Sequence, residues 1–242
     1  MLLELAVADA FGVAFEYAPK SFIEKNNHAI FYSKHPRHNI PPGFYSDDTQ
    51  MSLAIAELML SNDPWTPLTI ANKFVEAFKR DPRRGYASGF YQFLTGIKDG
   101  QDFLNKISPL SDKSGAAMRT APIGLYPDLK EVRRKTRLQA AVTHNTVDGL
   151  ASAEAASLLV YYCKNNLGPV NEAGFWIEQT LQGTSPNDWS VPWVGKVKTK
   201  GWMSVRAAIT ALSQHTSLTE LLKTCINFSG DVDTVASIAL AA

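Results

Sequence analysis

The sequence predicts an all-α protein that folds as a single compact domain of many helices. Apolar residues recur at helical spacing in roughly ten segments, whereas almost no segment alternates polar and apolar residues as a strand would. The chain has 242 residues of ordinary composition, with no internal repeat, low-complexity tract or obvious linker. A chain of this length can bury one large core. Helices without strands then leave helix-on-helix packing as the architecture.

The first predicted helix runs from Leu2 to Phe15 and contains Asp9, which is either solvent-facing or hydrogen-bonded. Residues 21–44 follow without a clear period and are rich in Pro and Gly, so we expect a long loop there. His35 and His38 in this loop have the spacing of a ligand pair, although loop histidines without a third partner are usually exposed.

Helix start signals are clear in the middle of the chain. Thr66 and Pro67 are typical of an N-cap and a first helical residue, for a helix that reaches about Arg80. Asp128 is the N-cap of another predicted helix. Predicted helices also cover an apolar stripe at 90–97, a long segment at 147–163, and shorter segments within 168–183, 205–212 and 218–226, with a Trp- and Pro-containing loop at 184–200.

Two acidic motifs open apolar helices that are far apart in the chain. Asp47 and Asp48 precede the second predicted helix, and Asp231 and Asp233 precede the last. Helix capping explains such residues, but a cap needs one side-chain oxygen, and each motif supplies two carboxylates beside a helix too apolar for the surface. Four converging carboxylates repel one another unless a cation lies between them. Oxygen ligands favour Mg²⁺, Mn²⁺ or Ca²⁺ over zinc, so we predict one or two metal ions here.

Two further features are candidates for ligand contacts. Small residues at 114–118 would let a ligand approach backbone N–H groups, and a helix start there would favour a phosphate, although tight helix packing needs small residues as well. His144 lies in a polar break between two strongly helical segments. It is either a buried, hydrogen-bonded histidine or a substrate contact.

Charge and cysteine content limit the partners and the compartment. Lys and Arg total 24 against 23 Asp and Glu, so the net charge of +1 does not call for a nucleic acid. Cys163 and Cys225 lack metal-ligand spacing, and we expect free thiols and a cytoplasmic protein. The apolar start of the chain lacks a basic segment and contains acids, and no run of about 18 apolar residues follows. We expect neither an export signal nor a membrane span.

Taken together, five segments resemble the ADP-ribosylglycohydrolase family, the relatives of the dinitrogenase-reductase-activating glycohydrolase. Residues 7–16 resemble the family's Gly-Asp-Ala-Leu-Gly helix and the acid after it, with Ala8 in place of the first glycine. The other matches, in family order, are 46–49 to the first metal motif, 114–119 to the Asn-Gly-Ala-Ala-Met-Arg loop, 143–144 to the Thr-His segment and 230–234 to the second metal motif. Ser114 stands in place of the loop Asn.

The resemblance implies a domain of this family over residues 1–242, shortened at its C-terminus because the last helix ends without a cap. It also implies two Mg²⁺ ions, with Mn²⁺ as the alternative metal. The implied metal ligands are Ser46, Asp47, Asp48, Asp231, Asp233 and Thr234. The implied substrate-binding residues are Ser114, Gly115, Ala116, Ala117 and Met118 near the ADP-ribose phosphates and His144 near the distal ribose.

The implied activity is removal of ADP-ribose from a protein side chain, arginine first, or from a small acceptor, by hydrolysis of the glycosidic bond at the distal ribose. The candidate catalytic carboxylates are Asp47, Asp48 and Glu16. A base must take the proton of the attacking water, with Asp48 as first choice and Glu16 as the alternative. An ADP-ribose-binding module without turnover and a helical protein whose acids are only caps are the competing interpretations. Neither a nucleic acid nor a membrane is an expected partner.

Overall fold

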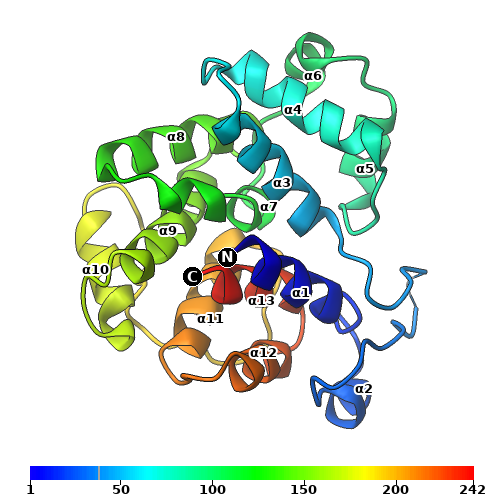
Figure 1. The fold of residues 1–242 in the computed structure, drawn as a ribbon, viewed down its shortest axis with the longest axis vertical. Coiled ribbons are helices and arrows are strands. Elements are labelled where there is room, and N and C mark those ends of the chain that lie inside the picture. The colour runs from blue at the N-terminus through cyan, green and yellow to red at the C-terminus, as the bar shows by residue number, and fades with distance from the viewer. Residues whose placement is uncertain (38) are drawn as a thin grey trace.

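The first and last helices, α1 (Leu2–Gly12) and α13 (Val232–Ala241), pack against each other at the centre of the molecule (Figure 1). A Cβ atom added at Gly12 would lie 2.6 Å from the Cα of Asp233, a distance that real side chains do not allow. The two helices can approach this closely only because Gly12 has no side chain.

The computed structural model describes residues 1–37 and 39–242, and this part of the chain contains thirteen α-helices, two 3₁₀ helices and no β-strand. The all-α prediction is confirmed. The remaining elements are α2 (Lys20–Asn26), α3 (Asp47–Leu60), α4 (Pro67–Arg80), α5 (Ser88–Thr95), α6 (Gly100–Lys106), α7 (Gly115–Met118), η1 (Ala121–Leu125), α8 (Leu129–Ala141), α9 (Val147–Lys164), η2 (Val170–Glu172), α10 (Ala173–Thr180), α11 (Gly201–Leu212) and α12 (Leu218–Asn227).

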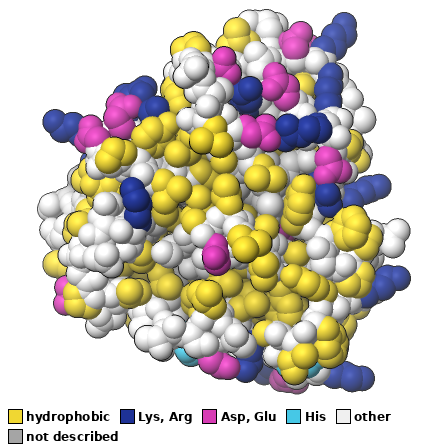
Figure 2. Space-filling model, in the orientation of Figure 1, with side chains coloured by type: hydrophobic (Ala, Val, Ile, Leu, Met, Phe, Trp, Pro, Cys, Tyr) yellow, Lys and Arg dark blue, Asp and Glu magenta, His cyan; other side chains and the backbone are white. Residues whose placement is uncertain are grey.

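Two apolar cores hold these helices together. The first core is formed by α1 and α9 to α13, with Phe15, Trp189 and Val235 fully or almost fully buried in it. The second core is formed mainly by α3, α4, α6 and α8, around Met51 and Phe74. On the face shown in Figure 2, hydrophobic side chains gather over the middle, and most Lys and Arg side chains lie toward the edge. Over the described residues, no helix combines the length and the apolar character needed to cross a membrane.

Helices with clear start signals have the predicted bounds. Thr66 caps α4 by accepting a hydrogen bond from the Thr69 N–H at 3.1 Å, and Asp128 caps α8 by accepting one from the Lys130 N–H at 3.0 Å. The predicted long loop at 21–44 was wrong in part, because its beginning belongs to α2. That helix has only seven residues and buries one of them, Ile23, so no apolar stripe marks it in the sequence. The segment 168–183 divides into η2 and α10.

Replacing Gly12 by alanine should lower the free energy of unfolding by about 1–3 kcal/mol, because the added methyl group overpacks the contact between α1 and α13. For a chain of this size the melting temperature should fall by roughly 3–10 °C, which thermal unfolding followed by circular dichroism measures. Gly89→Ala is the matched control, since a Cβ there meets nothing within 4 Å. An unchanged melting temperature for Gly12→Ala would show that the two helices separate without cost.

Candidate active site

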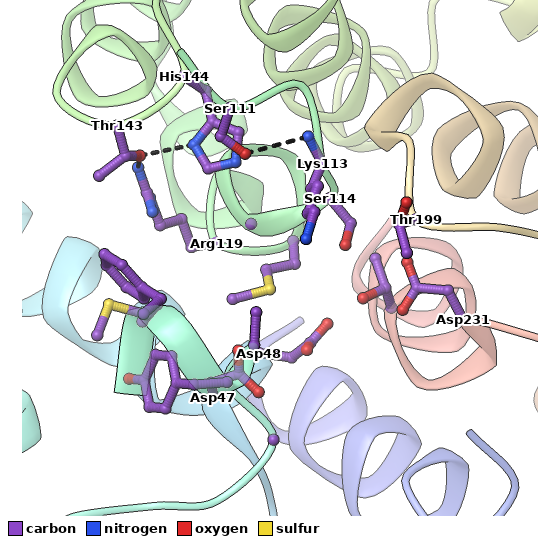
Figure 3. Close-up of a pocket in the computed structure, with 18 of the residues that line it drawn as sticks. Asp47, Asp48, Ser111, Lys113, Ser114, Arg119, Thr143, His144, Thr199 and Asp231 are labelled. Carbon is purple, nitrogen blue, oxygen red and sulfur yellow. Dashed lines mark hydrogen bonds between the residues drawn. The ribbon is translucent and has the colours of Figure 1, made fainter. Parts of the chain in front are cut away.

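A pocket of about 690 Å³ is lined by residues of the second core, such as Met51 and Met118, and by polar residues from helix starts and loops. Its walls include the first turns of α3 and α13, the start of α5, and α7. Figure 3 shows Asp47 and Asp48 on one side of the pocket, Thr143 and His144 opposite them, and Asp231 on a third side. Because these elements are far apart in the sequence, the pocket exists only in the folded chain.

One buried carboxylate in α1 holds the start of α3. Asp9 is fully buried and accepts hydrogen bonds from the N–H of Ser46 (2.9 Å), the hydroxyl of Ser46 (2.6 Å), the N–H of Thr49 (3.0 Å) and the hydroxyl of Thr49 (2.6 Å). Burial raises the pKa of Asp9, and these four donors oppose the rise. Asp9 therefore caps α3 from another helix and fixes the two residues between its partners, Asp47 and Asp48.

The second acidic motif is joined to the end of α1 by a backbone hydrogen bond. The Tyr17 N–H donates to the Gly230 carbonyl oxygen at 2.8 Å. Gly230 has a φ of +95°, and a Cβ atom there would lie 1.7 Å from the carbonyl oxygen of Val197, so only glycine fits. This joint brings Glu16 to Asp231 and Asp233.

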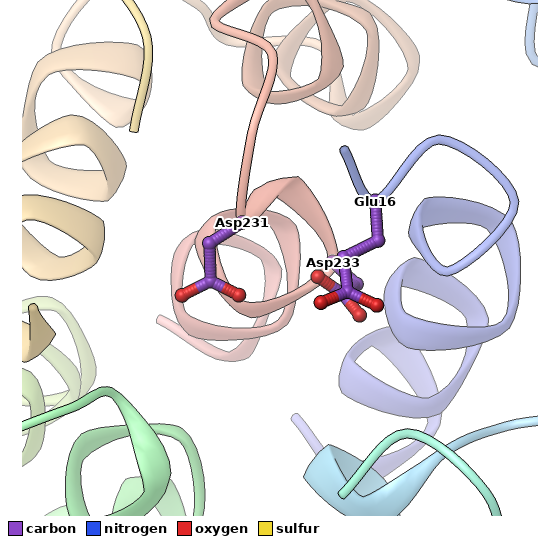
Figure 4. Close-up of side chains that lie close together, drawn as sticks. All are labelled: Glu16, Asp231 and Asp233. Atoms are coloured by element: carbon purple, nitrogen blue, oxygen red, sulfur yellow. The ribbon is translucent and has the colours of Figure 1, made fainter. Parts of the chain in front are cut away.

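Glu16, Asp231 and Asp233 form an acidic cluster whose candidate ligand atoms lie within 4.8 Å of one another (Figure 4). Burial and the neighbouring Asp231 raise the pKa of Glu16 to about 8. Burial and the charge of Glu16 also raise the pKa of Asp233. Ser204 donates a hydrogen bond to Asp231 at 2.9 Å and opposes the rise that burial causes in the pKa of Asp231.

The carboxylates at the start of α3 face the same electrostatic penalty. Asp47 and Asp48 are 9% and 3% exposed, and burial and the charge of Asp9 raise the pKa of both. The charge of Asp231 raises the pKa of both as well, which shows that the two motifs are close enough to repel. The two acidic motifs thus converge, as the sequence predicted.

These residues fit a hard divalent cation. Asp48 Oδ1 and Asp233 Oδ1 are buried and lack a hydrogen-bond partner among the described residues. A buried, unpartnered carboxylate oxygen is costly, and the surrounding acids make it more so. A cation with oxygen ligands would satisfy these atoms and remove the repulsion. The family resemblance, the unpartnered oxygens of Asp48 and Asp233, and the acidic cluster therefore all fit a divalent cation.

The predicted site residues divide into those that line the pocket and those that lie outside its lining. Glu16, Asp47, Asp48, Ser114, Gly115, Met118, His144, Asp231, Asp233 and Thr234 line the pocket. Ser46 is fully buried with its hydroxyl hydrogen-bonded to Asp9, and its role as a metal ligand stays a prediction. Ala116 and Ala117 are buried against the cores, so any contact with phosphate has to come through neighbouring residues of α7.

The expectation that the loop histidines are exposed is wrong for His35, the member of the pair that the structure describes. His35 is 3% exposed, and its Nδ1 accepts a hydrogen bond from the Arg37 N–H at 2.9 Å. Its Nε2 lies 2.9 Å from the Glu16 carbonyl oxygen and donates to it. His35 thus supports the backbone at Glu16, while His38 lies outside the described residues.

Sequence reasoning missed Arg119 and Gln139, which lie beneath the wall formed by Thr143 and His144. Arg119 is 1% exposed and donates from Nε to Gln139 Oε1 at 2.6 Å and from Nη2 to Thr143 Oγ1 at 2.8 Å. Its guanidinium carbon lies 4.3 Å from the centre of the Phe74 ring. Burial, then Arg119 and Lys113, lower the pKa of His144 to about 3. Only the Arg in the motif at 114–119 hinted at this network.

The comparisons with known proteins point to one family. A family model described as ADP-ribosylglycohydrolase matches residues 1–242. The ADP-ribosylhydrolase ARH3 of Mus musculus is 29% identical over 146 residues, 57% of this chain and 39% of the mouse protein. The ADP-ribosylarginine hydrolase Tri1 of Serratia proteamaculans (strain 568) is 22% identical over 173 residues, 68% of this chain and 46% of that protein. The matched stretch therefore covers less than half of either relative.

A solved structure, described as an ADP-ribosylglycohydrolase-related protein complex, shares the fold of this chain. Its TM-score is 0.71 at 21% sequence identity, and the match covers 99% of this chain and 83% of that one. At this identity the likeness concerns the fold. The arrangement of helices that brings the acidic motifs together is thus one that another protein of this kind also has.

We expect Mg²⁺ to raise the melting temperature of the wild-type protein, because an ion held only by the folded state stabilises that state, by about 2.7 kcal/mol at 100 times its Kd. Asp233→Asn should remove most of this rise. In Mg²⁺ the wild type should therefore have the higher melting temperature. In EDTA the variant should melt at or above the wild type, because it carries one repelling charge fewer. Differential scanning calorimetry measures both, and an equal Mg²⁺ response in the two proteins would contradict the metal site.

Replacing Asp9 by asparagine should destabilise the protein by about 2–4 kcal/mol. The amide nitrogen is itself a donor, so it cannot accept the hydrogen bonds that one carboxylate oxygen accepts in the wild type. The variant should also respond less to Mg²⁺, since the start of α3 loses its support. Urea unfolding and Mg²⁺ titration measure the two effects. Asp99→Asn is the control: Asp99 caps α6 with one hydrogen bond from the Asp102 N–H, and Asn caps as well as Asp. Equal stabilities of the two variants would show that Asp9 is an ordinary cap.

Proposed function

The chain belongs to the ADP-ribosylglycohydrolase family, and we propose that it hydrolyses the bond between ADP-ribose and a modified side chain with the help of two divalent cations. The observation that carries the proposal is the convergence of carboxylates from the turn after α1, the start of α3 and the start of α13 in one pocket. A helical protein whose acids are only caps would gain nothing from gathering them where they repel.

The metal ligands that we propose are Asp47 and Asp48 from the first motif and Asp231, Asp233 and Thr234 from the second, with Ser46 as a further candidate. Oxygen ligands suit Mg²⁺, and Mn²⁺ accepts the same set. When bound, the cations supply positive charge that holds vicinal sugar hydroxyls and lowers the pKa of a nearby water. The residues of the chain then have to position the sugar and move the protons.

In the proposed reaction, the oxygen of water bonds to the anomeric carbon of the distal ribose and the glycosidic bond breaks. One water proton goes to a carboxylate, and a carboxylic acid of the site gives a proton to the leaving nitrogen or oxygen, so the site neither gains nor loses a proton overall. Asp48 is our first choice for the base because it lines the pocket from the start of α3, where its carboxylate oxygen that holds no cation would accept the proton. Glu16 is the alternative, since it lies in the same pocket beside the second motif.

The size and lining of the pocket support a substrate as large as ADP-ribose. A volume of about 690 Å³ lies within the range of roughly 300–1,000 Å³ usual for small-molecule sites. Gly115 and Met118 of α7 line the part of the pocket that we assign to the phosphates. We propose arginine as the first acceptor to test because one relative is described as an ADP-ribosylarginine hydrolase.

Incubation with arginine-linked and serine-linked ADP-ribosyl peptides should release free ADP-ribose with Mg²⁺ or Mn²⁺ and none in chelator. Asp48→Asn should lower the rate by about 10²- to 10⁴-fold, the usual contribution of a general base, while the helical circular dichroism stays intact. Liquid chromatography of the released ADP-ribose measures the rate for each linkage.

Asp128→Asn is the matched control, because it exchanges an exposed helix cap for an equivalent one and should leave release unchanged. Calorimetry with ADP-ribose accompanies the assay. Tight binding of ADP-ribose by the wild type without its release from either peptide would contradict the proposed hydrolase activity and favour an ADP-ribose-binding module.

A further inference from the structure

A chain of hydrogen bonds runs from a buried arginine to the histidine on the pocket wall. Arg119 Nη2 donates to Thr143 Oγ1 at 2.8 Å, and Thr143 Oγ1 lies 2.6 Å from His144 Nδ1 (Figure 3). Arg119 is itself anchored by Gln139, which accepts from its Nε, and Gln139 in turn donates to the Ala116 carbonyl oxygen at 3.1 Å. This series of hydrogen bonds therefore starts at buried residues and ends at His144, which lines the pocket.

The chemistry of these groups favours one direction for the hydrogen bond between Thr143 and His144. A guanidinium group has donors only, so the Thr143 hydroxyl must accept from Arg119. The remaining hydrogen of that hydroxyl needs an acceptor, and His144 Nδ1 is its one neighbour of that kind among the hydrogen bonds of the described residues. We therefore infer that the hydroxyl hydrogen goes to Nδ1, in which case this nitrogen carries no proton.

The surroundings also keep the ring of His144 neutral. The ring is almost fully buried, and the charged groups that act on it, Arg119 and Lys113, are both cations. A second proton would have to displace the Thr143 hydrogen from Nδ1 and place a third positive charge beside these two. A neutral imidazole without a proton on Nδ1 carries its hydrogen on Nε2.

The ring is held in place from two sides. A Cβ atom at Gly115 would lie 3.1 Å from Cε1 and 3.4 Å from Nε2 of His144, so the backbone of α7 lies close to the edge that carries the Nε2 hydrogen. A Cβ atom at Gly149 would lie 2.9 Å from the His144 Cβ. The His144 N–H also donates to the Ala140 carbonyl oxygen at 2.7 Å. These close approaches restrict the rotation of the ring.

We propose that Arg119 and Thr143 are positioning residues that hold His144 as a neutral imidazole with its hydrogen on Nε2, so that it offers the substrate a fixed hydrogen-bond donor. His144 then recognises an acceptor, such as a ribose or phosphate oxygen, and serves as neither a base nor a cation. The identity of the substrate rests on the proposed function, but the state of the ring does not.

Nuclear magnetic resonance of the histidine ring nitrogens tests this state directly in the whole protein, with His144→Gln to assign the signal. In the wild type at pH 7, Nδ1 should be unprotonated and Nε2 protonated, and the ring should not titrate between pH 5 and 8. Thr143→Ser keeps the hydroxyl and should preserve this spectrum. Thr143→Val removes the hydroxyl, so the ring should populate both neutral forms and titrate at a higher pH than in the wild type.

Calorimetry with ADP-ribose gives the second reading. Thr143→Val should bind roughly 3- to 10-fold more weakly, the loss expected for one misdirected hydrogen bond, and Thr143→Ser should recover most of that loss. A wild-type ring with its hydrogen on Nδ1, a charged ring at pH 7, or a Thr143→Val spectrum equal to that of the wild type would overturn the proposal. A wild type that shows the Nε2-protonated ring but does not bind ADP-ribose would contradict the proposed function alone.

Discussion

The arrangement of the whole site depends on the four hydrogen bonds that Asp9 accepts from Ser46 and Thr49. A buried carboxylate is stable only when donors surround it, and here all four donors come from the first turn of one other helix. The same helix, α1, packs on α13 through Gly12. One helix therefore sets the position of both acidic motifs, and a shift of α1 would move them relative to each other.

The gathered carboxylates carry an electrostatic cost that the rest of the fold has to offset. Burial raises the pKa values of Asp47, Asp48, Asp231 and Asp233, and the charges of neighbouring carboxylates raise those of Asp47, Asp48 and Asp233 further. The buried, unpartnered carboxylate oxygens of Asp48 and Asp233 add to the cost. Two large apolar cores on either side hold the helices that bear these groups. Perturbed titratable groups in a cleft are typical of functional sites, because chemistry needs charges that water would otherwise screen.

The opposite wall of the pocket carries hydrogen-bond donors and a buried cation instead of carboxylates. Arg119, Thr143 and His144 line this wall, and in the tautomer that we propose His144 carries a donor hydrogen on Nε2. A ligand that has sugar hydroxyls for the acidic side and acceptor oxygens for the other side matches both walls. The pocket thus has a polarity that a purely structural cavity does not need.

The sequence by itself determined the all-α class, the helix starts that carry a clear cap, such as those of α4 and α8, and the two acidic motifs. Helical period, caps and adjacent carboxylates are local signals that need no distant partner. Tertiary structure alone decided that Asp9 caps α3, that Glu16 joins Asp231 and Asp233, and that Arg119 orients His144 through Thr143. It also placed α2 in a segment without periodicity and the Ser46 hydroxyl on Asp9. These outcomes depend on contacts between residues tens to hundreds of positions apart, and the direction of a hydrogen bond is settled only when both partners and their other neighbours are in place.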